Sequence, residues 1–146
     1  MWMARETQQS STGDTMRKLV LLMLLAMVSS GAAAAWVRVG KSAGDGFDYY
    51  ADPATIHRSG NYVKMWVVYD YQTPQVVSGQ QFLSTKLQFE YDCKDMRSRM
   101  LYATTHSGNM ANLDIVATVN NPTVDWGPIS PATLGEQLWK FACRKQ

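Results

Sequence analysis

Several segments of the chain alternate between apolar and polar residues, as the two faces of a half-buried β-strand do. The clearest alternation runs over residues 82–93. Its apolar positions are Leu83, Leu87, Phe89, Tyr91 and Cys93, and its polar positions are Lys86, Gln88, Glu90 and Asp92. This pattern predicts a strand with a buried side and a solvent-facing side, and it places Cys93 on the buried side.

A second predicted strand, residues 62–72, differs because both of its faces carry large apolar side chains. One face would present Val63, Met65, Val67, Tyr69 and Tyr71, and the other Tyr62, Lys64, Trp66, Val68 and Asp70. Further strands are expected at residues 36–39, 47–51, 97–106 and 114–120. Turns or loops are expected at residues 44–46, 59–61, 73–79 and 121–128, with a single helical turn after Asp52.

The end of the chain follows a helical period instead. Its apolar residues Leu134, Leu138, Phe141 and Ala142 are spaced to share one face of an α-helix. Ser130 and Pro131 occupy positions typical of a helix cap and a first helical residue, so we predict a helix over residues 131–143. Together these elements predict an α+β fold: an antiparallel sheet of about six strands with one C-terminal α-helix packed on one face.

The beginning of the chain has the features of a secretory signal peptide. Within residues 16–35, Arg17 and Lys18 precede an apolar run that is too short to span a bilayer, and a small-residue cleavage site follows. Residues 1–15 lack an apolar core, so we expect translation to begin at Met16 and the upstream residues to be a mis-assigned or non-native leader. Residues 36–146 would then be the mature chain, with the length of a single domain.

Composition narrows the range of partners for this mature chain. It contains eleven basic and ten acidic side chains, a balance that predicts no nucleic-acid partner. No apolar run after residue 35 is long enough to form a transmembrane segment. The first cysteine, Cys93, lies far beyond the apolar run, so no lipid anchor is expected. We predict a periplasmic or secreted protein, with display on the cell surface left open.

The mature chain contains two cysteines, Cys93 and Cys143. An even number of cysteines in an exported protein favours one disulfide over two free thiols. Closing a loop of about 50 residues would stabilise the fold by roughly 4 kcal/mol through the entropy of the unfolded chain. A metal or redox site is the weaker alternative, because the cysteines form no C-x-x-C motif and no closely spaced histidine pair accompanies them. No cofactor is predicted.

No group of residues in the sequence predicts catalysis. His57 and His106 are the only histidines, lie far apart along the chain and are expected at a turn and a strand end. No serine has the G-x-S-x-G context of a hydrolase nucleophile. Acidic and basic residues alternate near Cys93, as solvated ion pairs do: Glu90, Asp92 and Asp95 with Lys94, Arg97 and Arg99. A non-enzymatic protein is therefore expected.

Aromatic side chains form the candidate binding surface. The strand over residues 62–72 is apolar on both faces, whereas a single helix can cover only one face of a sheet. The uncovered residues are expected to contact another protein or a second copy of this chain. The candidate interface residues are Tyr62, Trp66, Tyr69 and Tyr71. The alternative is that loops over residues 73–79 or 121–128 fold across this face and bury it.

Short motifs follow one another in order along nearly the whole mature chain. They are Trp36-Val37-Arg38-Val39, Tyr50-Ala51-Asp52-Pro53-Ala54-Thr55-Ile56, Gly60 before the Trp66 strand to Asp70-Tyr71, Glu90-Tyr91-Asp92-Cys93 with Arg97 and Arg99, Ser107-Gly108-Asn109, Trp126 and Leu138-Trp139-Lys140-Phe141-Ala142-Cys143. This set resembles the surface-adhesin protein E family. The resemblance implies a small secreted or surface domain with an antiparallel sheet, a C-terminal helix, one disulfide and a tendency to dimerise.

The resemblance leaves three hypotheses about function. The family takes its name from an adhesin that binds host extracellular-matrix and plasma proteins, while many members look like plain periplasmic proteins. We therefore expect first an exported, non-catalytic binding module of unknown ligand. The alternatives are a surface adhesin for host extracellular matrix and, less favoured, a small periplasmic enzyme.

Overall fold

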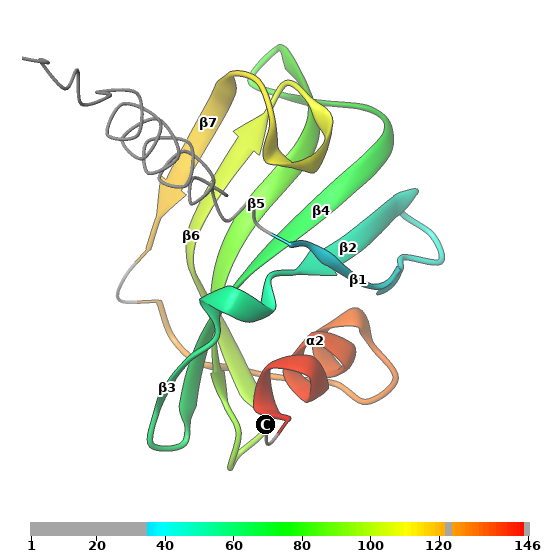
Figure 1. The fold of residues 1–146 in the computed structure, drawn as a ribbon. Coiled ribbons are helices and arrows are strands. Elements are labelled where there is room, and N and C mark those ends of the chain that lie inside the picture. Colours follow the sequence, from blue (N-terminus) through cyan, green and yellow to red (C-terminus); the bar gives the residue numbers. More distant parts are fainter. Residues whose placement is uncertain (1–34, 122–123, 145–146) are drawn as a thin grey trace, which may run out of the picture. The chain divides into compact units, whose positions relative to one another are not determined.

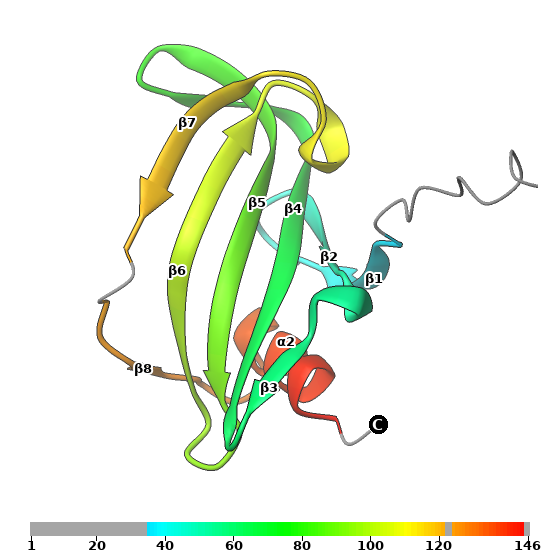
Figure 2. The ribbon, with the colours of Figure 1, turned by 60° about the vertical axis from the view of Figure 1, so that its left-hand side comes forward.

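The computed structural model describes residues 35–121 and 124–144, and this part of the chain is built around an antiparallel sheet. Its eight strands are followed by one α-helix. The elements are β1 (Val37–Lys41), β2 (Phe47–Ala51), β3 (His57–Ser59), β4 (Tyr62–Val77), β5 (Gln80–Asp92), β6 (Arg97–His106), β7 (Ile115–Asn120), β8 (Gly127–Pro128) and α2 (Leu134–Cys143). Figure 1 labels all of them except β8, which Figure 2 labels. The predicted leader and, apart from Ala35, the predicted signal peptide lie outside the described residues.

The strands are arranged in the order β1-β2-β4-β5-β6-β7, with β3 beside β4 and β8 beside β6. Every pair is antiparallel, as short connections between successive strands favour. The predicted α+β class is confirmed, and β2 and β6 have the predicted bounds. The two shortest strands, β3 and β8, were not predicted, because three and two residues are too few for an alternation to be recognised.

Two single-turn 3-10 helices connect the strands: η2 (Pro53–Thr55) and η3 (Asn109–Ala111). The turn after Asp52 is the predicted one, and its cap is visible. The Asp52 carboxylate accepts a hydrogen bond from the backbone N–H of Ala54 at 3.0 Å. This bond satisfies a donor that the first turn of a helix would otherwise leave unpaired.

The predicted loop over residues 73–79 is wrong. Strand β4 continues to Val77 and β5 begins at Gln80, so only Ser78 and Gly79 form the turn. Both turn residues have positive φ (50° and 79°), as tight hairpin turns require. Pro74, which favoured a loop, lies where the pairing of β4 with β5 is irregular, and its missing N–H breaks no regular ladder there.

The predicted start of the helix is also wrong, by three residues. Thr133, not Ser130, is the N-cap: its hydroxyl accepts a hydrogen bond from the backbone N–H of Glu136 at 3.3 Å. The Glu136 carboxylate in turn accepts one from the N–H of Ala132 at 2.8 Å. Ala132 has a φ of 59°, which ends the turn that follows Pro131 before a helix can form. The Thr-x-x-Glu pair is thus the stronger capping signal.

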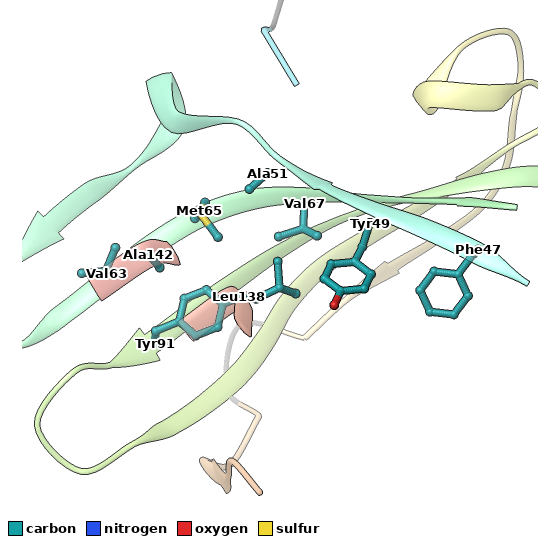
Figure 3. Packing of buried hydrophobic residues seen from close by; sticks show 9 residues of the cluster. All are labelled: Phe47, Tyr49, Ala51, Val63, Met65, Val67, Tyr91, Leu138 and Ala142. Atoms are coloured by element: carbon teal, nitrogen blue, oxygen red, sulfur yellow. The ribbon is translucent and has the colours of Figure 1, made fainter. Parts of the chain in front are cut away.

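The apolar face of α2 packs on the sheet, against β1, β4 and β5. Figures 1 and 2 both show the helix beside the β1–β2 hairpin. Leu138 and Ala142 are buried, and they join a cluster of buried side chains from β2, β4 and β5, shown in Figure 3. The cluster consists of Phe47, Tyr49, Ala51, Val63, Met65, Val67, Tyr91, Leu138 and Ala142. Of the two apolar faces predicted for the strand over residues 62–72, the inner one is that of Val63, Met65 and Val67, which are fully buried.

The predicted disulfide between Cys93 and Cys143 is confirmed, with Cα atoms 5.6 Å apart. It joins the end of α2 to the residue that follows β5. Two hydrogen bonds support the same junction: Trp139 Nε1 donates to the Asp92 carbonyl at 2.9 Å, and Arg58 Nη2 donates to the Ala142 carbonyl at 3.0 Å. The C-terminal end of the helix is therefore held to the sheet covalently and by polar contacts.

Candidate functional site

The sheet face opposite α2 carries an ordered set of polar and aromatic side chains, which we call the open face. Strand pairing arranges them in rows that run across β4, β5 and β6. The rows are Tyr62–Asp92–Arg97, Lys64–Glu90–Arg99, Trp66–Gln88–Tyr102, Val68–Lys86–Thr104 and Asp70–Ser84–His106. Asn120 of β7 extends the third row, because it pairs with Tyr102.

One end of the open face is covered by Trp126, from the segment between β7 and α2. The indole stacks on the Tyr62 ring with centroids 5.3 Å apart. The guanidinium groups of Arg97 and Arg99 lie 5.6 and 4.5 Å from the centroid of the Trp126 ring, within the range of cation–π interactions. The predicted alternative, that a loop over residues 121–128 folds across this face and buries it, holds only in part: Trp126 packs on the first row, but Tyr62 remains 43% exposed.

The other end of the open face is covered by the turn that contains η3. The Asp70 carboxylate accepts hydrogen bonds from the N–H of Met110 at 2.6 Å and from the side chain of Asn109 at 3.1 Å. The hydroxyl of Ser84 donates to the Gly108 carbonyl at 2.5 Å and accepts from the Ala111 N–H at 2.9 Å. These polar contacts fix the turn over the fifth row.

Between the two covered ends lies a solvent-open groove of about 440 Å³. Its floor and walls come mainly from the second and third rows. The lining residues are Lys64, Trp66, Gln88, Glu90, Arg99, Leu101, Tyr102 and Asn120. The volume is within the range of small-molecule and peptide sites. The groove is therefore the candidate binding site on the face that α2 leaves open.

Two aromatic side chains shape the centre of the groove. Trp66 and Tyr102 are each partly exposed, and their rings meet edge to face with centroids 5.9 Å apart. The ammonium group of Lys86 lies 4.7 Å from the centroid of the Trp66 ring, next to the groove. Such contacts orient the indole while leaving part of it accessible to a ligand.

Two ion pairs border the groove on the side of Trp126. Arg99 donates from Nε to one oxygen of Glu90 at 2.7 Å, and its Nη2 lies 2.6 Å from the same oxygen. Arg97 contacts Asp92 at 2.7 Å, and this hydrogen bond holds the pKa of the Asp92 carboxyl below its usual range, with help from two backbone N–H groups. The pairing was predicted, but the prediction that these ion pairs are solvated is wrong for two of their carboxylates: Glu90 and Asp92 are only 8% and 2% exposed.

The four predicted interface residues do not share one surface. Tyr62 and Trp66 lie on the open face. Tyr69 and Tyr71 lie on the opposite face, where their rings are 4.9 and 5.2 Å from that of Phe47, beside the buried cluster. Burial raises the pKa of the Tyr69 hydroxyl well above its usual value, in keeping with this packing.

Tyr102 and Asn120 belong to the groove and were missed in the sequence. Strict alternation from Arg97 and Arg99 would put Leu101, not Tyr102, on the open face. The pairing of β5 with β6 shifts by one residue at this point: Phe89 pairs with Met100, whereas Gln88 pairs with Tyr102. This β-bulge reverses the alternation in β6, and nothing in the local sequence marks it.

The two histidines do not lie together in a site. His57 is exposed on β3, whereas His106, expected at a strand end, is buried with Nε2 2.9 Å from the Thr104 hydroxyl. Burial lowers the pKa of the His106 imidazole. Residues 35–121 and 124–144 contain no group of three His, Cys, Asp or Glu side chains arranged to hold a metal ion. Within these same ranges, no helix has the length and apolar character needed to cross a membrane.

Several solved structures are similar to this fold. Protein E from non-typeable Haemophilus influenzae matches 78% of this chain and 78% of its own at 11% sequence identity, with a TM-score of 0.54. A selenomethionine form of Haemophilus influenzae protein E matches 77% of this chain and 88% of its own at 12% identity, with a TM-score of 0.57. At such low identity these similarities concern the fold.

Comparison of sequences gives the family. No curated protein sequence matches the chain. Residues 36–144, however, match the family described as Surface-adhesin protein E over almost all of the predicted mature chain. The chain therefore belongs to the surface-adhesin protein E family.

Proposed function

We propose that this chain is an exported, non-catalytic binding module whose groove on the open face receives a segment of another protein. The observation that carries the proposal is the groove itself: two partly exposed aromatic rings, Trp66 and Tyr102, lie between two covered ends of a sheet face. Tryptophan and tyrosine contribute more than most residues to protein interfaces, because they offer a large apolar area together with a polar group.

The open shape of the groove favours an extended segment over an enclosed small molecule. Amide side chains, Gln88 and Asn120, lie next to the aromatic rings and offer both donors and acceptors to a peptide backbone. The floor is a sheet held by the continuous β4–β5 ladder at these rows, by the bulged β5–β6 ladder and by the Arg99–Glu90 ion pair, so the groove is formed before the ligand arrives. A preformed site loses less entropy on binding.

Membership of a surface-adhesin family supports a location outside the cytoplasm and a role in binding. Within that location, the protein could act in the periplasm, in the medium or on the outer surface. Treating intact cells with a protease and then fractionating them distinguishes these cases. Degradation by protease added to intact cells would favour an adhesin for host extracellular matrix, whereas protection in the periplasmic fraction would favour an internal partner.

Selection of peptides from a phage-displayed library tests the groove directly. The mature chain serves as bait in parallel with Trp66→Ser and with a control, Val76→Ser, whose side chain is 65% exposed on the β4–β5 hairpin. We expect peptides that bind the wild type and the control but not Trp66→Ser. If every enriched peptide binds Trp66→Ser equally well, the groove is not the binding site and the proposal is overturned.

A second copy of this chain is one protein that the open face could receive. Sedimentation equilibrium of the wild type, Trp66→Ser and Val76→Ser separates this case from a foreign partner. Self-association that is lost only in Trp66→Ser would identify the second copy as the ligand of the groove. A monomer at every concentration, together with Trp66-dependent peptide binding, would identify a foreign protein segment.

A further inference from the structure

The geometry points to the chemical class of the ligand: an extended peptide segment with two acidic residues that flank an apolar one. This inference rests on the proposed function and concerns the same groove. The apolar side chain would contact Trp66, and the two carboxylates would bind Lys64 and Lys86. The inference comes from the charges on the open face that have no carboxylate partner within the described residues.

Most acidic side chains of this face already have partners. Glu90 is bound by Arg99, and Asp92 is bound by Arg97, with nitrogen–oxygen distances of 2.6 and 2.7 Å. Asp70, at the far end, accepts the Met110 N–H in the η3 turn. The two ion pairs neutralise Glu90 and Asp92, and the hydrogen bond holds Asp70 in place.

The basic side chains of the face are more numerous. After Arg97 and Arg99 have been paired, Lys64 and Lys86 have no carboxylate within 4 Å among the described residues. Lys64 lies across from Glu90 in the strand pairing, but that carboxylate is engaged by Arg99. Lys86 instead places its ammonium 4.7 Å from the Trp66 ring centroid. An acidic ligand would thus meet Lys64 in the lining of the groove and Lys86 next to it, over the Trp66 ring.

The positions of the two lysines set the spacing of the ligand. Lys64 is in the second row and Lys86 in the fourth, with Trp66 in the row between them. Neighbouring strands are about 4.8 Å apart. The second and fourth rows are four residues apart along a strand, which is about 13 Å. In an extended peptide, residues i and i+4 are separated by the same distance and point to the same side, with residue i+2 between them. The fitting sequence is therefore acidic-x-apolar-x-acidic.

The expected effect of each lysine is moderate, because Lys64 is exposed and Lys86 partly exposed, and salt screens such charges. Loss of one lysine should weaken binding by roughly two- to fivefold, the range of exposed ion pairs. Loss of both should weaken it by about tenfold, if the two contacts act independently. Rising ionic strength should reduce the preference for the acidic peptide.

Calorimetric titration tests the inference with two blocked peptides of sequence Ala-Glu-Ala-Leu-Ala-Glu-Ala and Ala-Gln-Ala-Leu-Ala-Gln-Ala. The proteins are the mature wild type, Lys64→Gln, Lys86→Gln, the double variant and Trp66→Ser. The charge-matched control is Lys41→Gln, an exposed position on β1. We expect the wild type and the control to prefer the glutamate peptide by at least fivefold at low salt. The double variant should bind the two peptides equally, and Trp66→Ser should bind both more weakly.

Other outcomes overturn the inference in distinguishable ways. Equal affinity of the wild type for the two peptides, or library peptides that depend on Trp66 but are basic or neutral, would disprove the acidic ligand while leaving the proposed function intact. Trp66-dependent binding of a neutral oligosaccharide with no peptide binding, or a library that yields no Trp66-dependent peptide, would disprove both. Unchanged circular dichroism of the lysine variants confirms that they remain folded.

Discussion

The two faces of β4 show how one strand can serve both stability and binding. Val63, Met65 and Val67 point to the α2 side and are fully buried. On the open face, Lys64 is exposed and Trp66 is partly exposed. Because side chains alternate along a strand, these two sets of residues are interleaved in sequence yet separated by the thickness of the sheet. A substitution one residue along the chain therefore tests a different property of the protein.

The difference between the faces follows from what covers each. The α2 face is covered by a helix with an apolar stripe and is tied down by a disulfide, so its stability depends on close packing and chain connectivity. The open face is covered at its ends by Trp126 and by the η3 turn, mainly through ion pairs, aromatic contacts and hydrogen bonds. Its centre is left accessible. Perturbing the first face should cost stability, and perturbing the second should cost binding.

The largest effect on stability is expected from replacing both cysteines by alanine. The disulfide closes a loop with a sequence separation of 50, and its loss should reduce the free energy of unfolding by about 4 kcal/mol, within the range of 2–5 for native disulfides. Urea denaturation of the double variant and the wild type measures this loss. A loss below about 1 kcal/mol would show that contacts of α2 other than the disulfide hold the helix in place.

The next effect is expected from Leu138→Ala on α2. The Leu138 side chain is 1% exposed within the buried cluster, and its truncation should cost about 2–5 kcal/mol through lost burial and the cavity that remains. Lys140→Ala, on the exposed side of the same helix, is the control and should change the free energy of unfolding far less. Equal effects of the two substitutions would mean that the apolar stripe of α2 does not pack on the sheet.

A smaller effect is expected from Trp66→Ser on the open face. The indole contacts Tyr102 edge to face and Lys86 through a cation–π interaction, which together account for about 1–2 kcal/mol of stability. Its neighbour Met65 is fully buried on the α2 side. Met65→Ala should reduce the free energy of unfolding by about 2–5 kcal/mol. If denaturation gives Trp66→Ser the larger loss, the open face is a second core and its aromatic residues are not free to bind.

The smallest effect concerns the pH dependence that Asp92 contributes. The hydrogen bond from Arg97 lowers the pKa of Asp92 in the folded state, so the ionised carboxylate stabilises the fold above its unfolded pKa of about 3.9. This stabilisation is lost as the pH falls through the folded pKa. Urea midpoints at pH 7 and pH 2.5 should therefore differ less in Arg97→Gln than in the wild type. The same pH dependence in both proteins would show that Arg97 does not set the pKa of Asp92.

The sheet and the helix could be predicted from the sequence because their signals are local. Alternation over residues 82–93 and the helical spacing of Leu134 and Leu138 depend only on neighbours along the chain. The errors arose where local signals conflicted. Pro74 is typical of a loop, but it lies in an irregular part of β4. Pro131 is typical of a first helical residue, but the helix begins later, after its cap Thr133.

The groove could be predicted only in part, because its shape depends on distant segments. Tyr62, Trp66, Tyr69 and Tyr71 were all expected at an interface, because the alternation did not indicate which face the helix would cover. Only Tyr62 and Trp66 lie on the open face. Tyr102 reaches the groove through a bulge in β6. Glu90 and Asp92 are buried at the end of the open face that Trp126 covers. Trp126 comes from a segment far along the chain. Neither the bulge nor the covering segment leaves a periodic signal near the residues that it affects.

An NMR titration of the isotope-labelled mature chain with the glutamate peptide tests most directly whether the open face is the binding face. We expect chemical-shift changes at the indole N–H of Trp66 and at the backbone amides of Lys64, Lys86 and Tyr102, with little change along α2. The glutamine peptide serves as the control and should produce weaker changes at the same positions. Changes centred on Leu138 and the α2 side, or no changes at any peptide concentration, would contradict the assignment of binding to the open face.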